Sequence, residues 1–213
     1  MTQITHHLDD ALLMGYSAGT LPEAFNLVVA THISMCDECR ALLGAFDAVG
    51  GAVLEDAGAV AMDMDAAALL DSVGPQKVTP VVAKPTSDIY PQVLMDYLGP
   101  DPEQVKWSKL GMGVRQAILK TSDRASVRLL HIPAGCEMPD HGHHGTELTL
   151  VLKGAFIDEQ DRFARGDIEI ATEDDHHKPV ADNSGPCICL AATDAPLHFS
   201  GFVQRIAQRW ARI

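Results

Sequence analysis

The sequence predicts an α+β protein of two domains, an all-α N-terminal domain and an all-β C-terminal domain, in a chain of 213 residues. Apolar residues recur at helical spacing through the first third of the chain. Residues 76–87 hold two prolines and no helical period, which is typical of an extended linker. Nearly everything after Trp107 reads as short β-strands separated by turn residues. We therefore expect a helical domain, a linker with a lead-in segment, a β domain and a helical tail, at residues 1–76, 77–106, 107–200 and 201–213.

The helical domain is expected to hold four helices, at residues 8–18, 22–32, 36–51 and 58–70. Gly19 ends the first helix, and Pro22 begins the second because proline is favoured in a first helical turn. The fourth helix is rich in Ala and Met. It carries more apolar side chains than a three-helix core would use, so it either packs on the other helices or adapts to a partner.

Six short runs with strand character follow Trp107, and glycine, proline or aspartate turns separate them. Strands at this spacing predict an all-β barrel or sandwich. The expected strands are residues 114–119, 126–132, 148–152, 155–157, 167–171 and 187–192.

The charge is strongly negative and unevenly distributed. A net charge of −13 argues against direct binding to nucleic acid, which needs a basic surface. Residues 1–76 hold eleven acidic side chains and one basic one, Arg40, so that this part has a net charge of −10. An acidic module of this kind is either simply solvated or faces a partner with a basic surface.

The cell compartment is expected to be the cytoplasm. No apolar run approaches the length of a membrane span, and no signal peptide is visible. Five cysteines is an odd number, which favours a reducing compartment over a disulfide framework.

The most informative motif of the helical domain consists of His32, Cys36 and Cys39. On a continuing helix, a spacing of four stacks His32 and Cys36 on one face, and Cys39 closes the next turn. Zn²⁺ takes four thiolate or imidazole ligands in a tetrahedron, so that one ligand is missing. We expect it in the histidine pair at the start of the chain and choose His6, with His7 as the alternative. The other reading is two core cysteines and a surface histidine.

These residues resemble the zinc-binding anti-sigma domain, over about the first third of the chain. The resemblance is carried by His6, His7, Leu12, Leu13, Tyr16, Gly19, Pro22, His32, Cys36, Cys39 and Arg40. That family pairs an N-terminal histidine with a His-x-x-x-Cys-x-x-Cys helix, and it binds and blocks sigma factors of the extracytoplasmic-function group. The resemblance therefore implies a structural zinc site and a sigma factor as partner.

The strongest motif of the β domain lies between residues 135 and 154. His141 and His143 are two apart on a strand and so point to the same face, and Glu147 returns a carboxylate to them after a turn. His144 points away by the same parity. Two imidazoles and a carboxylate suit Zn, Fe, Mn, Ni or Cu. The alternative is a barrel whose histidines hold no metal.

This motif resembles the first cupin motif at Gly135, His141, His143, Glu147 and Gly154. The second cupin motif supplies a third histidine after a glycine, and here Gly166 and His177 fit that spacing, with His176 as the competing ligand. The residues that usually lie between and after them are replaced by Thr172, Asp174 and Ala181. The resemblance implies a second metal site, formed by His141, His143, Glu147 and His177.

Taken together, the two halves resemble the ChrR-type anti-sigma factors, in which a zinc anti-sigma domain is fused to a metal-binding cupin. The resemblance implies a regulator without enzymatic activity that binds and inhibits an extracytoplasmic-function sigma factor in a 1:1 complex. It implies zinc at two sites and release of the sigma factor when the cupin senses singlet oxygen or a related oxidative stress. The alternative is a metal-dependent cupin enzyme of the dioxygenase or isomerase type with a helical docking domain.

Cys187 and Cys189 are two apart on a predicted strand and therefore face the same way. They are either small core side chains or thiols that lie near the cupin metal and change oxidation state during signalling.

Overall fold

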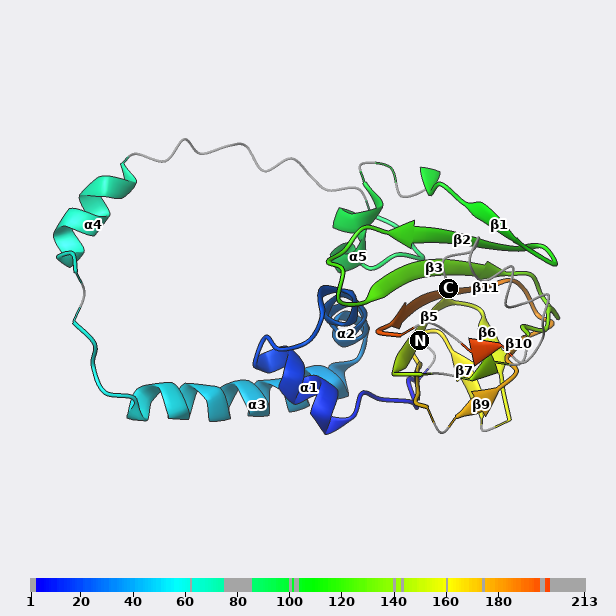
Figure 1. Cartoon of the computed structure of the whole chain (residues 1–213), viewed down its shortest axis with the longest axis horizontal. Helices are drawn as coiled ribbons and strands as arrows, with labels where there is room; N and C mark the ends of the chain where they lie inside the picture. Colours follow the sequence, from blue (N-terminus) through cyan, green and yellow to red (C-terminus); the bar gives the residue numbers. More distant parts are fainter. Residues whose placement is uncertain are drawn as a thin grey trace.

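The computed structural model describes residues 3–61, 63–74, 86–99, 101, 104–139, 141–142, 144–159, 161–173, 175–195 and 198–199 (Figure 1). At positions 141, 176, 198 and 199 the backbone alone is described. The expected helical tail at residues 201–213, and residues 77–85 of the expected linker, lie outside the described residues. No described helix combines the length and the apolar composition that crossing a membrane requires.

The described helices all precede the strands. They are α1 (Asp10–Ser17), α2 (Glu23–Met35), α3 (Asp37–Asp56), α4 (Ala66–Val73) and α5 (Gln92–Leu98).

Local chemistry explains where these helices begin and end. The Asp9 carboxylate caps α1 by accepting a hydrogen bond from the Leu12 backbone N–H at 2.7 Å, and Gly19 leaves the helix with a φ of 67°. We expected the third helix to end at the glycine pair near residue 50, but α3 continues to Asp56. Glycine in a helix interior costs about 1 kcal/mol relative to alanine and does not by itself end the helix. α4 begins after its cap Asp65, later than expected.

The strands form three antiparallel sheets, with orders β1-β2-β3-β11-β5-β8, β10-β6-β7 and β12-β4-β9. Their bounds in the first sheet are β1 (Ser108–Gly111), β2 (Val114–Leu119), β3 (Ser126–Ile132), β5 (Glu147–Lys153), β8 (Ile168–Ala171) and β11 (Cys187–Thr193). The smaller sheets contain β4 (His141–Gly142), β6 (Ala155–Ile157), β7 (Arg162–Ala164), β9 (His176–His177), β10 (Val180–Ala181) and β12 (His198–Phe199). The predicted combination of a helical part with an antiparallel β domain of the cupin type is confirmed.

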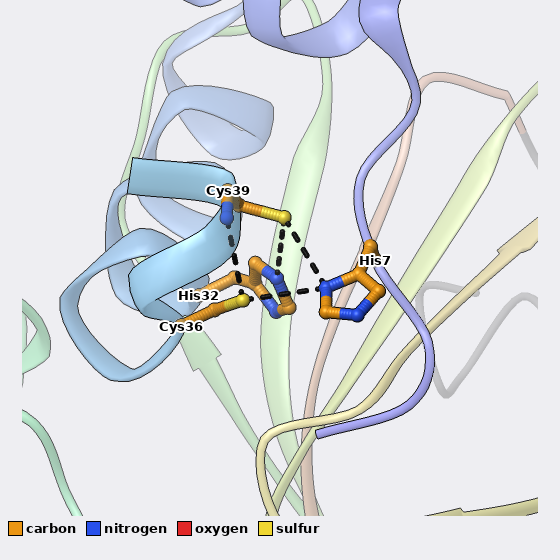
Figure 2. A group of neighbouring side chains, drawn as sticks. All are labelled: His7, His32, Cys36 and Cys39. Carbon is orange, nitrogen blue, oxygen red and sulfur yellow. Dashed lines mark hydrogen bonds between the residues drawn. The ribbon is translucent and has the colours of Figure 1, made fainter. Parts of the chain in front are cut away.

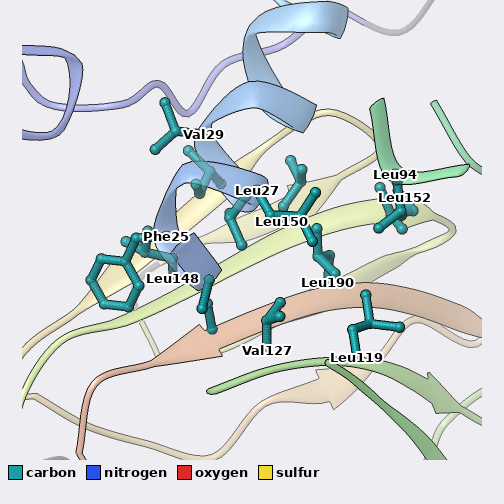
Figure 3. Packing of buried hydrophobic residues seen from close by; sticks show 14 of the residues in the cluster. Phe25, Leu27, Val29, Leu94, Leu119, Val127, Leu148, Leu150, Leu152 and Leu190 are labelled. Atoms are coloured by element: carbon teal, nitrogen blue, oxygen red, sulfur yellow. The ribbon is translucent and has the colours of Figure 1, made fainter. Parts of the chain in front are cut away.

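Both faces of the six-stranded sheet are buried. On its outer face, Leu148, Leu150 and Leu190 pack with the α2 side chains Phe25 and Leu27 (Figure 3). On its inner face, a second cluster contains side chains of β5, β6, β7, β10 and β11 and so fills the space between two of the sheets. Strand β11 serves both clusters, because successive side chains of a strand point to opposite faces.

Helix α2 lies between two layers. It contacts α1 and α3 as well as β11, β5 and β3, and its buried residues extend from Ala24 to His32. One apolar cluster therefore contains residues from both sides of the predicted linker. This packing brings the His32 end of α2 and the start of the chain against the edge of the cupin.

Candidate metal centres

Four nitrogen and sulfur donors converge where α2 meets α3 (Figure 2). His32 lies in the last turns of α2, Cys36 forms the junction between the helices, and Cys39 lies in the first turn of α3. His7 reaches them from the extended segment before α1. His32, Cys36 and Cys39 are at most 2% exposed, and all four donor atoms lie within 4.8 Å of one another.

The separations between these donors fit a tetrahedral zinc ion. His32 Nε2 lies 3.3 Å from Cys39 Sγ, and His7 Nδ1 lies 3.3 Å from Cys36 Sγ and 3.6 Å from Cys39 Sγ. Bonds of about 2.3 Å to sulfur and about 2.05 Å to nitrogen at the tetrahedral angle separate the two atoms by about 3.6 Å. The set of two thiols and two imidazoles is one that structural zinc sites use. The residues present therefore fit the ion.

Burial sets the protonation of these donors in the absence of a cation. It lowers the pKa of His32 to about 4, although the backbone of Gly166 opposes the shift, so the imidazole is neutral at pH 7. Burial likewise raises the pKa of Cys39 to about 11, which keeps the thiol protonated. A divalent cation in the cluster would compensate the buried thiolates, and its binding would release protons.

His6, our first choice for the fourth ligand, does not lie in this cluster; His7 does. The His6 imidazole instead packs on Phe163, with ring centroids 4.3 Å apart, and its Nε2 lies 3.2 Å from Asp161 Oδ2. The correction has a simple cause. Neighbouring side chains of an extended segment point to opposite sides, so that only one histidine of the pair can face the cysteines.

The structure describes the cupin ligand set in part. Glu147 begins β5 and is 8% exposed, and His177 in β9 is 4% exposed. His141 in β4 pairs with His177 across the two strands, which places the two backbones side by side. The side chain of His141 and the whole of His143 lie outside the described residues. The four-residue metal site of the cupin therefore stays a prediction.

Two buried carboxylates that the sequence reading missed surround His177. Glu169 Oε1 of β8 lies 2.7 Å from His177 Nδ1, and Asp158 Oδ2 lies 3.9 Å from the same atom. Burial raises the pKa of Glu169 to about 7, against the effect of the hydrogen bond to His177. The pKa of His177 is raised: burial lowers it, but the neighbouring carboxylates Glu169, Glu147 and Asp158 outweigh that effect. A carboxylate on Nδ1 leaves Nε2 of this imidazole for a metal ion.

The comparisons with known proteins agree with both halves of the molecule. Residues 98–195 match the family of the ChrR cupin-like domain. The chain is 54% identical over 211 residues to the anti-sigma-E factor ChrR of Cereibacter sphaeroides, a match that covers 99% of each chain. The chain belongs to the ChrR family of anti-sigma factors.

A solved structure agrees with this assignment to the ChrR family. The crystal structure of Rhodobacter sphaeroides SigE in complex with the anti-sigma ChrR contains a chain that matches this one with a TM-score of 0.78 and 52% identity. The match covers 90% of this chain and all of that one. The likeness therefore extends to the arrangement of the helical part and the cupin.

In this member of the ChrR family, Cys187 and Cys189 lie side by side in the barrel interior. Their Sγ atoms are 3.4 Å apart as free thiols, and neither residue is more than 1% exposed. The hydrogen bond with Cys187, together with burial, holds the pKa of Cys189 well above its ordinary value. They pack with Val151 and Phe156, as small core side chains do. A redox role for the pair stays a prediction.

Glu169 had a signal in the sequence that we did not use. It lies between two isoleucines in the run 167–171, so strand alternation places it on the opposite face from them. A carboxylate on the inner face of a barrel needs a partner, since burying an isolated charge is costly.

Proposed function

We propose that this protein is an anti-sigma factor that binds a sigma factor of the extracytoplasmic-function group and inhibits it. The observation that carries the proposal is the 54% identity to an anti-sigma factor over 99% of both chains. The proposal extends to this chain what the matching crystal structure contains, a complex of ChrR with SigE. A regulator of this kind needs a surface for its partner and does not need an active site.

The helices that lead away from the cupin support a protein partner (Figure 1). Every residue of α3 from Asp47 onward is exposed, and so is every residue of α4. Large apolar side chains are exposed along this part of the chain, at Val49, Val53, Leu54, Val60, Met64, Leu69, Leu70 and Val73. These helices expose apolar side chains in a part of the chain that is strongly acidic. Such a surface fits a partner whose own surface is basic and apolar, as that of a polymerase-binding protein is.

We propose that the cluster of His7, His32, Cys36 and Cys39 holds a structural zinc ion. Bound there, zinc would join the start of the chain to the junction of α2 and α3 and so contribute directly to the stability of the helical part. The donor separations of 3.3–3.6 Å and the burial of three donors support this assignment.

We propose further that the cupin is the sensory part and responds to singlet oxygen or a related oxidative stress. We assign the cupin a divalent metal ion held by His141, His143, Glu147 and His177. The buried Glu147 and the orientation of His177 by Glu169 support it. A change at this site would then weaken the complex with the sigma factor, while the helical part does the inhibiting.

The inhibitory function is tested with the full-length protein. Purified protein, added to polymerase and the extracytoplasmic-function sigma factor that copurifies from native cells, should abolish transcription from a promoter of that sigma factor. A Cys36→Ala variant should lose zinc and inhibition together, and Cys136→Ala is the matched control because Cys136 is outside the cluster. Normal transcription in the presence of folded wild-type protein would refute the proposal.

The sensory function is tested in cells. Glu147→Ala and His177→Ala should still repress the sigma factor's promoter in unstressed cells but should fail to release it under singlet oxygen. Asp161→Ala, an exposed carboxylate elsewhere on the cupin, is the control. If both variants respond as the wild type does, the cupin site has no part in signalling. The proposed anti-sigma function would not be affected by that result.

A further inference from the structure

We infer that Asp167 of the cupin is a positioning residue for His7, the zinc ligand contributed by the start of the chain. It acts through the backbone of residues 4–7, which we call the N-terminal strap. The inference rests on the proposed zinc site and adds that this site is completed by the cupin, 160 residues along the chain from His7.

The Asp167 carboxylate is saturated by the strap and by its own turn. Oδ1 accepts hydrogen bonds from the backbone N–H of Thr5 at 2.7 Å and of His6 at 3.0 Å, and from the Thr5 hydroxyl at 3.3 Å. Oδ2 accepts from the backbone N–H of Ala164 at 2.8 Å. The residue is 2% exposed, so these charge-assisted bonds are shielded from water.

The strap is also held on either side of this clamp. The His6 carbonyl accepts a hydrogen bond from the Ile168 N–H at 3.4 Å, and the His6 ring packs on Phe163. Ile4 lies over Gly166, where a Cβ atom would come within 2.6 Å of Ile4 Cδ1. Gly166 also has a φ of 95°, so glycine serves both the turn and the close approach of the strap.

The consequence falls on the next residue, His7. Once the backbone of Thr5 and His6 is fixed and the His6 ring faces the cupin, the His7 side chain must leave on the other side, toward the cysteines. In the structure His7 Nδ1 lies 3.3 Å from Cys36 Sγ. A ligand whose backbone is ordered beforehand loses less conformational entropy when the metal binds.

The same clamp joins the two candidate metal centres. Asp167 immediately precedes β8, and Glu169 two residues later bonds to His177 in the cupin. Strand β8 thus contacts the strap through Ile168 and the predicted cupin ligand His177 through Glu169.

The test uses the full-length protein loaded with Co²⁺ in place of zinc, because the thiolate-to-cobalt absorption reports the cysteine cluster and not the cupin. Two variants remove the clamp from opposite sides. Asp167→Ala removes the acceptor. Thr5→Pro removes two of its donors, the Thr5 backbone N–H and the Thr5 hydroxyl, and changes no residue of the cupin. Asp161→Ala is the matched control, since Asp161 is exposed and touches only the His6 ring in the strap.

We expect Asp167→Ala and Thr5→Pro to weaken Co²⁺ binding to the cysteine cluster about 10- to 100-fold, since each residue that loses its fixed backbone costs about tenfold. The control should bind as the wild type does. Thermal unfolding of each variant separates weaker metal binding from loss of the fold. Asp167→Ala also removes a hydrogen bond within the turn of the cupin, whereas Thr5→Pro changes only the strap. Wild-type affinity in both variants would overturn the inference. A wild-type protein without the cobalt–thiolate bands would instead refute the zinc site, and the inference with it.

Discussion

Replacement of His7 by alanine should separate the two histidines at the start of the chain. His7 Nδ1 lies 3.3 and 3.6 Å from the two cluster thiols. The His6 imidazole instead lies beside Asp161, Asp167 and Phe163. We therefore expect His7→Ala to lose most of the zinc affinity and His6→Ala to keep it. The backbone bonds of His6 to the cupin do not involve its side chain and survive its replacement.

The size of the effect follows from the number of donors. Structural zinc sites bind with an apparent free energy of about 10–16 kcal/mol. Shared among the four donors of this cluster, one ligand contributes about 2.5–4 kcal/mol, or about two to three orders of magnitude in affinity. His6→Ala removes ring contacts with two carboxylates, Asp161 at 3.2 Å and Asp167 at 3.6 Å. The Asp161 carboxylate is 65% exposed, and exposed pairs contribute at most about 1 kcal/mol. The buried Asp167 keeps its hydrogen bonds from the backbone of Thr5 and His6, so zinc affinity should fall far less than in His7→Ala.

The assay is competition for zinc with a chromogenic chelator at neutral pH. Cobalt absorption reports separately on the cysteine cluster. Circular dichroism verifies that both variants are helical. A large loss in His6→Ala together with full affinity in His7→Ala would show that the strap is in a different register from the one described.

Three further predictions concern the cluster, the core and the partner. Zinc affinity should rise with pH by at least about tenfold per unit between about pH 6 and 8, because binding must expel the proton of Cys39, whose pKa of about 11 keeps it a thiol there; chelator competition at several pH values measures this, and a flat profile contradicts it. The Leu190 side chain of β11 is fully buried on the face of the sheet that α2 covers. Leu190→Ala should therefore lower the free energy of unfolding by about 2–5 kcal/mol. The control Ile118→Ala, 44% exposed, should cost much less in the same denaturant titration, and equal losses would refute the packing described for α2. Affinity for the sigma factor should fall as salt is raised, since residues 1–76 carry −10 and screening weakens steering; calorimetry at several ionic strengths checks this, and a salt-independent affinity would count against charge recognition.

Local chemistry made much of this architecture predictable. The spacing of His32, Cys36 and Cys39 predicted that their donors meet, on the assumption of a continuing helix. The structure brings the three donors together by another path, since Cys36 is extended and separates α2 from α3. Short runs of strand-forming residues between turn residues predicted β2 and β3 with their observed bounds. Both features depend on residues that are close together in the sequence, so they could be predicted without the tertiary structure.

The extent of the helices was less predictable. The glycine pair near residue 50 was expected to end α3, yet the helix continues to Asp56. A glycine only lowers helical propensity, by an amount that the neighbouring residues can offset. The apolar residues of α2 also gave no sign that the helix is covered on both sides, because periodicity does not distinguish one packing partner from two.

The sequence by itself determined the family, the two-part architecture and three of the four donors of the cysteine cluster. Each depends on residues that lie close together in the sequence, as motifs or as a local pattern of helix or strand. Only the tertiary structure decided between His6 and His7. That choice depends on which side of the strap faces the cupin, and the carboxylate that decides it, Asp167, is 160 residues distant from His7 in the sequence. The same holds for Glu169 beside His177, a contact between two strands that no local pattern encodes. Which side chains meet across the fold is decided by the packing of whole elements. That packing minimises both the apolar surface exposed to water and the number of buried polar groups without a partner.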